Sequence, residues 1–278
     1  AWGGVLRDGS ETFTLISRAL TTFSSENLVW MNNEIIKLDI PDDASLTGVL
    51  NNQLIVQLKS DWTVQTNTYN TGTLLSLNFR ELLKGNKEIQ VIIEPDEFSS
   101  ISQVSTTKNK LLISLLTNVI SELHTYTFSN GTWSSEKMNA PDFGRISIAS
   151  TDDLSDQYFF NFQNFITPST LYAADASNNT FKVYKSLPAF FDASRYEVTQ
   201  YKAKSKDGTM VPYFMVAAKD LKNDGTNPTL VYAYGGFEIS SQPFYAATFG
   251  VSWLDKGGVF VLANIRGGGE YGPKWHQD

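Results

Sequence analysis

The chain of 278 residues contains no cysteine and only two histidines. Without cysteine there can be no disulfide, no thiolate catalysis and no cysteine-ligated zinc. The histidines, His124 and His276, lie far apart and lack a carboxylate pattern with metal-ligand spacing, so we expect no metal site and no cofactor. The absence of cysteine leaves the redox compartment open, and the choice between cytoplasm and periplasm stays undecided.

Long apolar runs and an excess of positive charge are also missing. No run approaches the roughly 20 apolar residues that a membrane helix needs, and the first four residues do not have the pattern of a signal peptide. The 22 Lys and Arg residues are scattered among 29 Asp and Glu residues, giving a net charge of −7. We therefore expect a soluble chain with neither a membrane nor a nucleic acid as its partner.

Short apolar strands separated by polar turns fill the chain from Glu11 to about Pro188. One kind of strand recurs at spacings in the forties and fifties, at Thr12–Ile16, Leu54–Leu58, Leu111–Leu115 and Tyr158–Phe162. A second strand follows after a polar turn, as at Leu74–Phe79, Leu123–Phe128 and Leu171–Ala174. A repeat of about 40–50 residues with several strands is typical of a β-propeller blade, although an irregular β-sandwich has a similar strand density. Four such units fit before Pro188, and four blades can also close a small ring by themselves.

Three tryptophans of the repeat region, Trp30, Trp62 and Trp133, admit two interpretations. They could form an aromatic platform for a sugar or a peptide. Because they fall in different repeat units, we favour packing between and within blades.

The pattern changes after residues 186–195, where the repeat ends. Residues 196–204 and 210–217 alternate as an antiparallel hairpin that turns at Lys206-Asp207-Gly208. Two continuous apolar runs follow, at 228–234 and 259–263, and we predict a helix between them that starts at Pro243 and stops at Gly257-Gly258. Two apolar strands joined through a helix predict a βαβ unit in a parallel sheet.

Gly267, Gly269 and Gly272 match the spacing G-x-G-x-x-G of a dinucleotide-binding loop. That fingerprint needs a helix opening on the last glycine and an acidic residue about 20 positions further on. Pro273 and Trp275 follow instead, and the sequence ends at Asp278. We expect these glycines to serve tight turns beside other chain segments.

A nucleophile is also missing. An α/β-hydrolase requires a serine on a G-x-S-x-G turn, followed by an acid and a histidine. Ser252 has Gly250 two residues before it but Leu254 two residues after it, and it falls inside the expected helix. We expect no catalytic triad within these residues.

Several motifs nevertheless agree in order and spacing: Ser205-Lys206-Asp207-Gly208-Thr209, Tyr234-Gly235-Gly236-Phe237, Asn264-Ile265-Arg266-Gly267-Gly268-Gly269-Glu270-Tyr271-Gly272 and Trp275-His276. With these motifs the chain resembles the prolyl oligopeptidase family of serine peptidases. The resemblance implies a seven-bladed propeller paired with an α/β-hydrolase domain. It also favours the proline-specific branch over the branch that cleaves after basic residues.

The resemblance implies two site residues. Tyr234 falls on the family's tyrosine whose hydroxyl helps to form the oxyanion hole, a role that suits a neutral phenol with a pKa near 10. Phe237 falls on a phenylalanine near the pocket for the residue before the scissile bond. Arg266 and Glu270 are expected to pair and to brace the glycine turn.

We therefore expect a fragment: an incomplete β-propeller of about four blades at 1–190, followed at 191–278 by the beginning of an α/β-hydrolase domain. The complete protein would hydrolyse short peptides after proline. Its partners would be short proline-containing peptides and, for this piece, the remainder of its own chain. The alternative is a non-catalytic propeller module that binds peptides or proteins.

Overall fold

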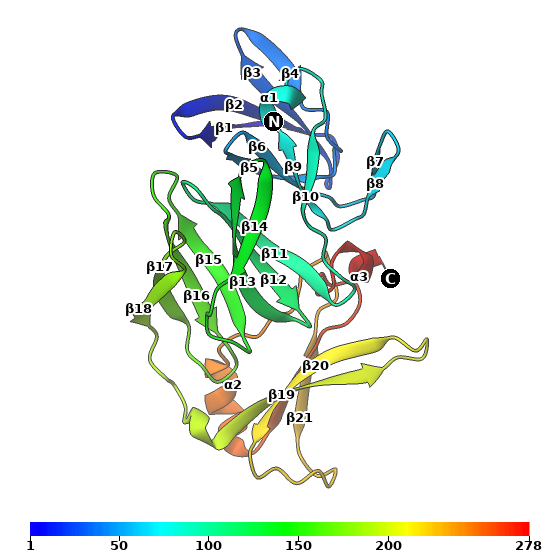
Figure 1. Cartoon of the computed structure of the whole chain (residues 1–278). Helices are drawn as coiled ribbons and strands as arrows, with labels where there is room; N and C mark the ends of the chain where they lie inside the picture. The colour runs from blue at the N-terminus through cyan, green and yellow to red at the C-terminus, as the bar shows by residue number, and fades with distance from the viewer. Residues whose placement is uncertain (278) are drawn as a thin grey trace.

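The computed structural model describes residues 1–277. Its first part contains four four-stranded antiparallel sheets, stacked as blades along the chain (Figure 1). Blade 1 consists of β1 (Trp2–Asp8), β2 (Glu11–Ala19), β3 (Ser25–Met31) and β4 (Glu34–Lys37), and blade 2 of β5 (Ser45–Leu50), β6 (Gln53–Gln57), β9 (Leu74–Asn78) and β10 (Ile89–Ile93). Blade 3 consists of β11 (Ser99–Thr106), β12 (Leu111–Thr117), β13 (Ile120–Ser129) and β14 (Thr132–Lys137), and blade 4 of β15 (Arg145–Thr151), β16 (Gln157–Gln163), β17 (Thr170–Asp175) and β18 (Thr180–Ser186). The small hairpin of β7 (Trp62–Val64) and β8 (Asn67–Tyr69) and the short helix α1 (Phe79–Leu82) are additions to blade 2.

The propeller architecture is visible in how the blades meet. The first strand of each blade contacts the first strand of the next, so β1, β5, β11 and β15 line a common axis. The recurring strands of the sequence are the second strands of the four blades, and the strands that follow them are the third strands. The prediction of four propeller-type units is therefore confirmed.

Burial distinguishes the two inner blades from the two outer ones. In blades 2 and 3 the second strands β6 and β12 are buried at nearly every position, because both faces of these blades pack against a neighbour. In blades 1 and 4 the second strands β2 and β16 alternate between buried and more exposed residues, as a sheet with one covered face does. Each outer blade thus has one face without a neighbouring blade.

The open face of blade 1 carries apolar side chains in register across the sheet. Val5 pairs with Thr14, Thr14 with Trp30, and Trp30 with Ile35, which places the four side chains on one face. Val5, Trp30 and Ile35 are 58%, 50% and 64% exposed.

The other two tryptophans of the repeat pack as expected. Trp62 lies against Tyr69 within the β7–β8 hairpin and packs on the core of blades 1 and 2. Trp133 of blade 3 donates its ring N–H to Ser76 Oγ of blade 2 at 2.8 Å. The structure therefore does not gather the three rings into one platform.

A fifth, mixed sheet follows the blades, with the order β19-β20-β22-β21. It contains β19 (Tyr196–Lys204), β20 (Met210–Ala218), β21 (Thr229–Ala233) and β22 (Val259–Ala263), preceded by a 3-10 turn at Ala193–Arg195. The hairpin β19–β20 and the parallel pair β21–β22 confirm the predicted hairpin and the predicted parallel unit. Strand β21 forms one edge of this sheet, and all five of its residues are exposed.

The helix between β21 and β22 starts later than predicted. Helix α2 spans Ala247–Ser252, and a 3-10 turn spans Leu254–Lys256. Pro243 does not start a helix, because the amides of Tyr245 and Ala246 donate to Gln163 Oε1 and Phe165 O of blade 4. Gly257 ends the 3-10 turn with φ +85°, so the predicted stop is correct.

One hydrophobic core joins the two parts of the chain. Phe165 and Val119, from loops of the propeller, are fully buried against Phe214 of β20 and Phe260 of β22. Phe244 and Phe249 pack around Phe260 from the segment before and within α2. The fifth sheet is thus held against the loops of blades 3 and 4.

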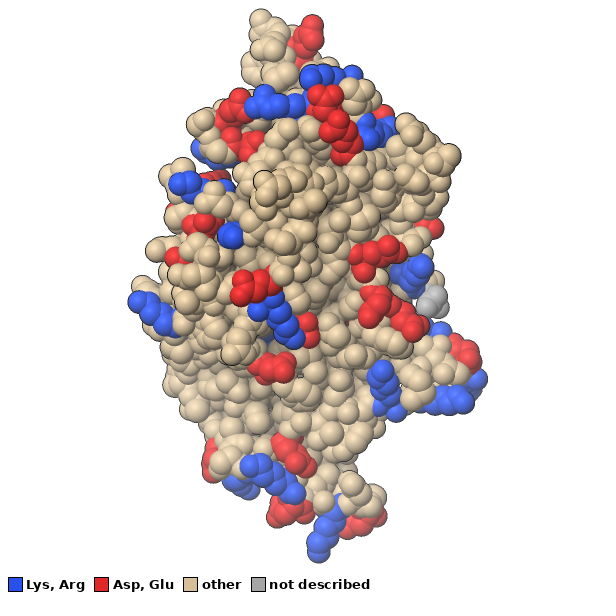
Figure 2. Space-filling model, viewed as in Figure 1, with Lys and Arg blue, Asp and Glu red and all other residues tan. Residues whose placement is uncertain are grey.

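None of the helices within residues 1–277 is both long and apolar enough to cross a lipid bilayer. Acidic and basic side chains alternate over the face in Figure 2, and no large area of a single charge is visible there.

Candidate functional site

Two glycine-rich loops lie side by side where β21 and β22 end. Because these strands are parallel and in register up to Ala233 and Ala263, their carboxyl ends share one edge of the sheet. The first loop begins with Tyr234-Gly235-Gly236-Phe237, and the second is Asn264–Gly272. Loops at the carboxyl ends of parallel strands are where open α/β sheets place their ligands.

The glycines let the two loops approach backbone to backbone. Gly267 has φ +93°, and a Cβ built on it would lie 2.1 Å from Gly235 O. A Cβ on Gly235, at φ +64°, would lie 2.6 Å from the side chain of Ile265. A Cβ on Gly269 would lie 2.3 Å from Glu238 O. The glycine run therefore serves close chain contact, as the sequence indicated.

A dinucleotide-binding loop requires a helix that opens on its last glycine, and the sequence predicts none after Gly272. A helix does begin there: α3 spans Pro273–Gln277, since proline is well accommodated in the first helical turn. The space next to Gly267 and Gly269 is occupied by neighbouring backbone. The Gly267 amide donates to Trp275 O at 2.9 Å. This loop packs on its own chain.

Tyr234 lies immediately after β21, with its side chain 47% exposed. Its ring lies over Gly236, where a Cβ would come within 3.3 Å of the ring. The phenol is therefore accessible at the edge of the sheet and held at its base by the loop. An accessible, neutral hydroxyl in this place can donate one hydrogen bond to a ligand.

Phe237 is held in an unusual backbone conformation. Phe237 and Glu238 have φ values of +53° and +57°, which non-glycine residues seldom adopt. The ring of Phe237 is 73% exposed and borders a cavity. The ring therefore stands in solvent at the edge of this cavity, on a backbone conformation that the surrounding structure must hold in place.

Glu270 anchors the first loop from inside the structure. Its Oε1 accepts the amide of Ser241 at 2.8 Å and a longer bond from Asn264 Nδ2 at 3.4 Å, and the residue is 1% exposed. Its Oε2 is buried and has no partner among the described residues. Burial raises the pKa of this carboxyl, although the hydrogen bond from Ser241 opposes the shift.

The predicted pair of Arg266 and Glu270 is wrong. Arg266 binds Asp207 and Ser205 at the turn of the β19–β20 hairpin. The hydrogen bond from the Thr209 amide, and then the one from Arg266, lower the pKa of Asp207 well below its usual range. Glu270 turns inward to the Ser241 amide instead. Arg266 and Glu270 lie close together in the sequence, but their side chains contact different segments of the chain, which the sequence did not indicate.

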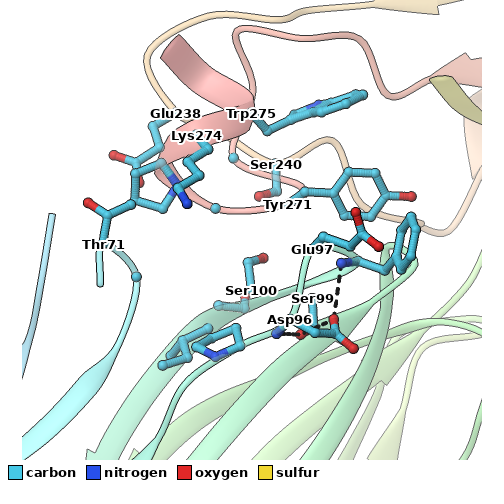
Figure 3. A pocket seen from close by; sticks show the side chains of 18 of the residues that line it. Thr71, Asp96, Glu97, Ser99, Ser100, Glu238, Ser240, Tyr271, Lys274 and Trp275 are labelled. Atoms are coloured by element: carbon cyan, nitrogen blue, oxygen red, sulfur yellow. Dashed lines mark hydrogen bonds between the residues drawn. The ribbon is translucent and has the colours of Figure 1, made fainter. Parts of the chain in front are cut away.

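A cavity of about 1010 Å³ separates the loops from the propeller. Figure 3 shows Glu238, Ser240, Tyr271 and Trp275 on one side and Asp96, Glu97, Ser99 and Ser100 on the other. The propeller residues belong to the start of blade 3 and the turn before it. Ser100 Oγ donates to Glu270 O at 3.0 Å, which fixes the base of the second loop to the blade.

Tyr271 forms part of the wall of this cavity. Its ring packs edge-on against Phe98 and Trp275, and its hydroxyl lies 3.4 Å from Asn118 Oδ1. Burial, and then the nearby charge of Glu270, raises the pKa of Tyr271 to about 12. This phenol therefore stays neutral at physiological pH.

The histidines and Ser252 have structural contacts. His124, in β13, lies 3.2 Å from Glu122, and His276, in α3, lies 2.6 Å from Gly267 O through Nδ1. Ser252 donates to Thr248 O within α2 at 2.6 Å. The described residues thus do not bring a serine and a histidine together.

Comparison with known proteins identifies the family. The family model of the prolyl oligopeptidase N-terminal β-propeller domain matches residues 2–187. An uncharacterized peptidase of Sinorhizobium fredii is 43% identical over 98% of this chain. The chain belongs to the prolyl oligopeptidase family. In the solved structures, a post-proline cleaving enzyme from Rickettsia typhi superposes on 97% of this chain with a TM-score of 0.87 and 31% identity.

The chain spans about two fifths of these relatives, 39% of the Sinorhizobium peptidase and 40% of the Rickettsia typhi enzyme. A prolyl endopeptidase of Elizabethkingia meningoseptica is 38% identical over 49% of this chain and 19% of its own length. The match to the prolyl oligopeptidase family therefore covers most of this chain, and the relatives themselves are longer.

Sequence reasoning missed two residues of this site. Lys59 and Glu238 form an ion pair of 2.9 Å although 179 positions separate them. The charge of Glu238 directly after the Tyr-Gly-Gly-Phe motif was a possible signal. No feature of the sequence indicated Lys59 as its partner.

Proposed function

We propose that the complete protein is a serine peptidase of the prolyl oligopeptidase family that hydrolyses short peptides after proline. In this proposal residues 1–190 are part of the propeller, and 191–278 are the beginning of an α/β-hydrolase domain. The observation that carries the proposal is Tyr234, an accessible phenol at the carboxyl end of parallel strand β21, beside a cavity-lining Phe237.

The edge strand β21 supports the hydrolase part of the proposal. Val231 and Tyr232 are 61% and 51% exposed, and they project from opposite faces of the strand. A parallel strand with apolar residues on both faces is suited to the interior of a sheet with both faces covered. Further strands and helices of the complete protein would cover it.

Each residue has one role in the proposed reaction. A serine from the remainder of the protein attacks the carbonyl carbon of the proline residue, the amine of the following residue leaves as the C–N bond breaks, and water then hydrolyses the acyl-enzyme. Tyr234 donates its hydroxyl hydrogen bond to the oxyanion that develops, and it keeps its proton throughout. Phe237 offers an apolar ring to the proline side chain. A histidine from the remainder of the protein takes the proton of the serine and passes it to the leaving amine. An acid, also from the remainder, orients this histidine.

The Tyr234→Phe variant of the full-length protein tests this role. Loss of one oxyanion donor should lower kcat on a proline-containing peptide by about 10²–10³, with KM nearly unchanged, because the bond forms only in the transition state. Steady-state kinetics of wild type and variant give both values. Unchanged kcat would remove Tyr234 from the oxyanion hole.

The alternative is a peptide- or protein-binding propeller without catalysis. The relatives that the chain matches are peptidases and endopeptidases by name, and this favours the enzyme. A wild-type full-length protein that binds proline-containing peptides but leaves them uncleaved would decide for the binding module.

A further inference from the structure

The loop that follows Tyr234 depends on contacts from two directions. From within its own part of the chain, the Glu238 amide approaches Gly267 O at 3.3 Å and His276 Nδ1 at 3.2 Å, and the Ser241 amide donates to Glu270. From the propeller, Lys59 Nζ reaches Glu238 Oε1 at 2.9 Å. Glu238 therefore receives contacts from both sides.

Lys59 comes from blade 2, in the turn between β6 and β7. Among the ion pairs of residues 1–277, Lys59–Glu238 is the only one that joins the propeller to the segment after residue 187. The two side chains are 32% and 29% exposed, so the pair is partly shielded from solvent. Partial shielding makes a charge pair stronger than a fully exposed one.

The backbone at this point needs support from its surroundings. Phe237 and Glu238 are consecutive residues in the left-handed region, and this conformation persists only where the surroundings hold it. The side chain of Glu238 is fixed to blade 2, and the ring of the preceding Phe237 borders the cavity. A shift of blade 2 against the fifth sheet would therefore move the ring.

We propose that the Lys59–Glu238 ion pair is a positioning contact through which blade 2 sets the place of Phe237, and thereby the fit of the proline side chain. This inference rests on the proposed function. It makes the propeller part of the specificity pocket without contact to the substrate. Lys59 and Glu238 are positioning residues, whereas Phe237 contacts the peptide.

Charge reversal in the full-length protein tests the contact. Lys59→Glu and Glu238→Lys each place like charges together, so each should lower kcat/KM on a proline-containing peptide about five-fold, mainly through KM. The preference for proline over alanine before the scissile bond should fall with it. The double variant, which restores an opposite-charge pair, should return both values to within about two-fold of wild type.

A matched control is Lys84→Glu. Lys84 pairs with Glu81 at 2.7 Å in the same blade, away from the cavity, so its reversal should leave the kinetics unchanged. Raising the salt concentration from about 0.05 M to about 0.5 M should raise KM of wild type and lower that of the single variants, because salt screens the attraction in wild type and the repulsion in the variants. Single variants with wild-type kinetics, or a double variant as impaired as the singles, would overturn the proposal.

Hydrogen exchange separates this inference from the proposed function. The amides of residues 238–241 should exchange faster in either single variant and recover in the double variant, whether or not the protein cleaves peptides. If the wild type is inactive but shows this exchange pattern, the peptidase proposal is refuted, whereas the positioning of the loop by the Lys59–Glu238 pair is supported. Active wild type with unchanged exchange in the singles would refute the contact alone.

Discussion

The buried carboxyl of Glu270 makes the stability of the site depend on pH. Burial raises its pKa in the folded state above the value of about 4.3 found in unfolded chains. The folded state therefore holds this proton more tightly, and the resulting stabilisation is complete below about pH 4.3 and is lost as pH rises through the folded-state pKa.

Glu270→Gln should remove the loss of stability that accompanies rising pH. A glutamine keeps the acceptor for the Ser241 amide and carries no charge, so the variant should gain melting temperature relative to wild type as pH rises from about 4 to about 7. Thermal unfolding of the full-length proteins at several pH values measures the difference. A difference that stays constant with pH would show that folding does not raise the pKa of Glu270.

For single residues, the sequence predicted their position in the fold better than the partners of their side chains. The two apolar runs predicted parallel strands, and in the structure the loops that follow these strands lie at the same edge of the sheet, Tyr234 in one and the glycine run in the other. The partners of Glu270 and Glu238 could not be predicted, since Ser241 and Lys59 reach them through the tertiary fold.

At the scale of the elements, the contact between the two loops depends on Gly267. Gly267→Ala should destabilise the protein by about 3 kcal/mol or more, because its Cβ would meet Gly235 O in addition to the strain of a positive φ. Gly208→Ala is the control: Gly208 has φ +95°, with no atom within 4 Å of its Cβ position, so only the strain of about 1 kcal/mol applies.

Thermal unfolding of the two full-length variants separates steric contact from backbone strain. Equal losses in Gly267→Ala and Gly208→Ala would mean that the loops can move apart without cost.

Element types were easier to predict than element ends. The blade strands and the β19–β20 hairpin follow from apolar alternation and turn residues, which are local properties. The start of α2 was wrong because tertiary hydrogen bonds take up the amides of Tyr245 and Ala246. Helix α3 was not expected, since a five-residue helix leaves almost no periodic signal.

At the scale of the whole molecule, three surfaces lack partners among the described residues: the open faces of blades 1 and 4 and the edge strand β21. Arg7 and Asp153 bring blades 1 and 4 together at 3.8 Å, but both side chains are 56% exposed, and such a pair contributes little. Four blades are thus weakly joined across the ring.

The chain of residues 1–278, purified alone, should therefore be inactive on peptides and should self-associate. Apolar faces and unpaired strand edges favour pairing with another chain. Mixing it with the remaining portion of the full-length protein should restore cleavage of a proline-containing peptide. Sedimentation and the peptide assay test both parts. A monodisperse monomer at micromolar concentration would mean that four blades close on themselves, which contradicts the incomplete ring.

The interlocking of the two glycine loops also affects how the protein is made. The loop that carries Phe237 rests on Gly267 and on His276, and His276 leaves the ribosome later than Gly235 by the time needed to add 41 residues. Translation adds about 5–20 residues per second, so roughly 2–8 s pass before this loop has the contact with His276. During the earlier part of this interval, until Val259–Ala263 has also left the ribosome, β21 has no β22 to pair with, and the nascent chain presents an apolar strand for chaperones to cover.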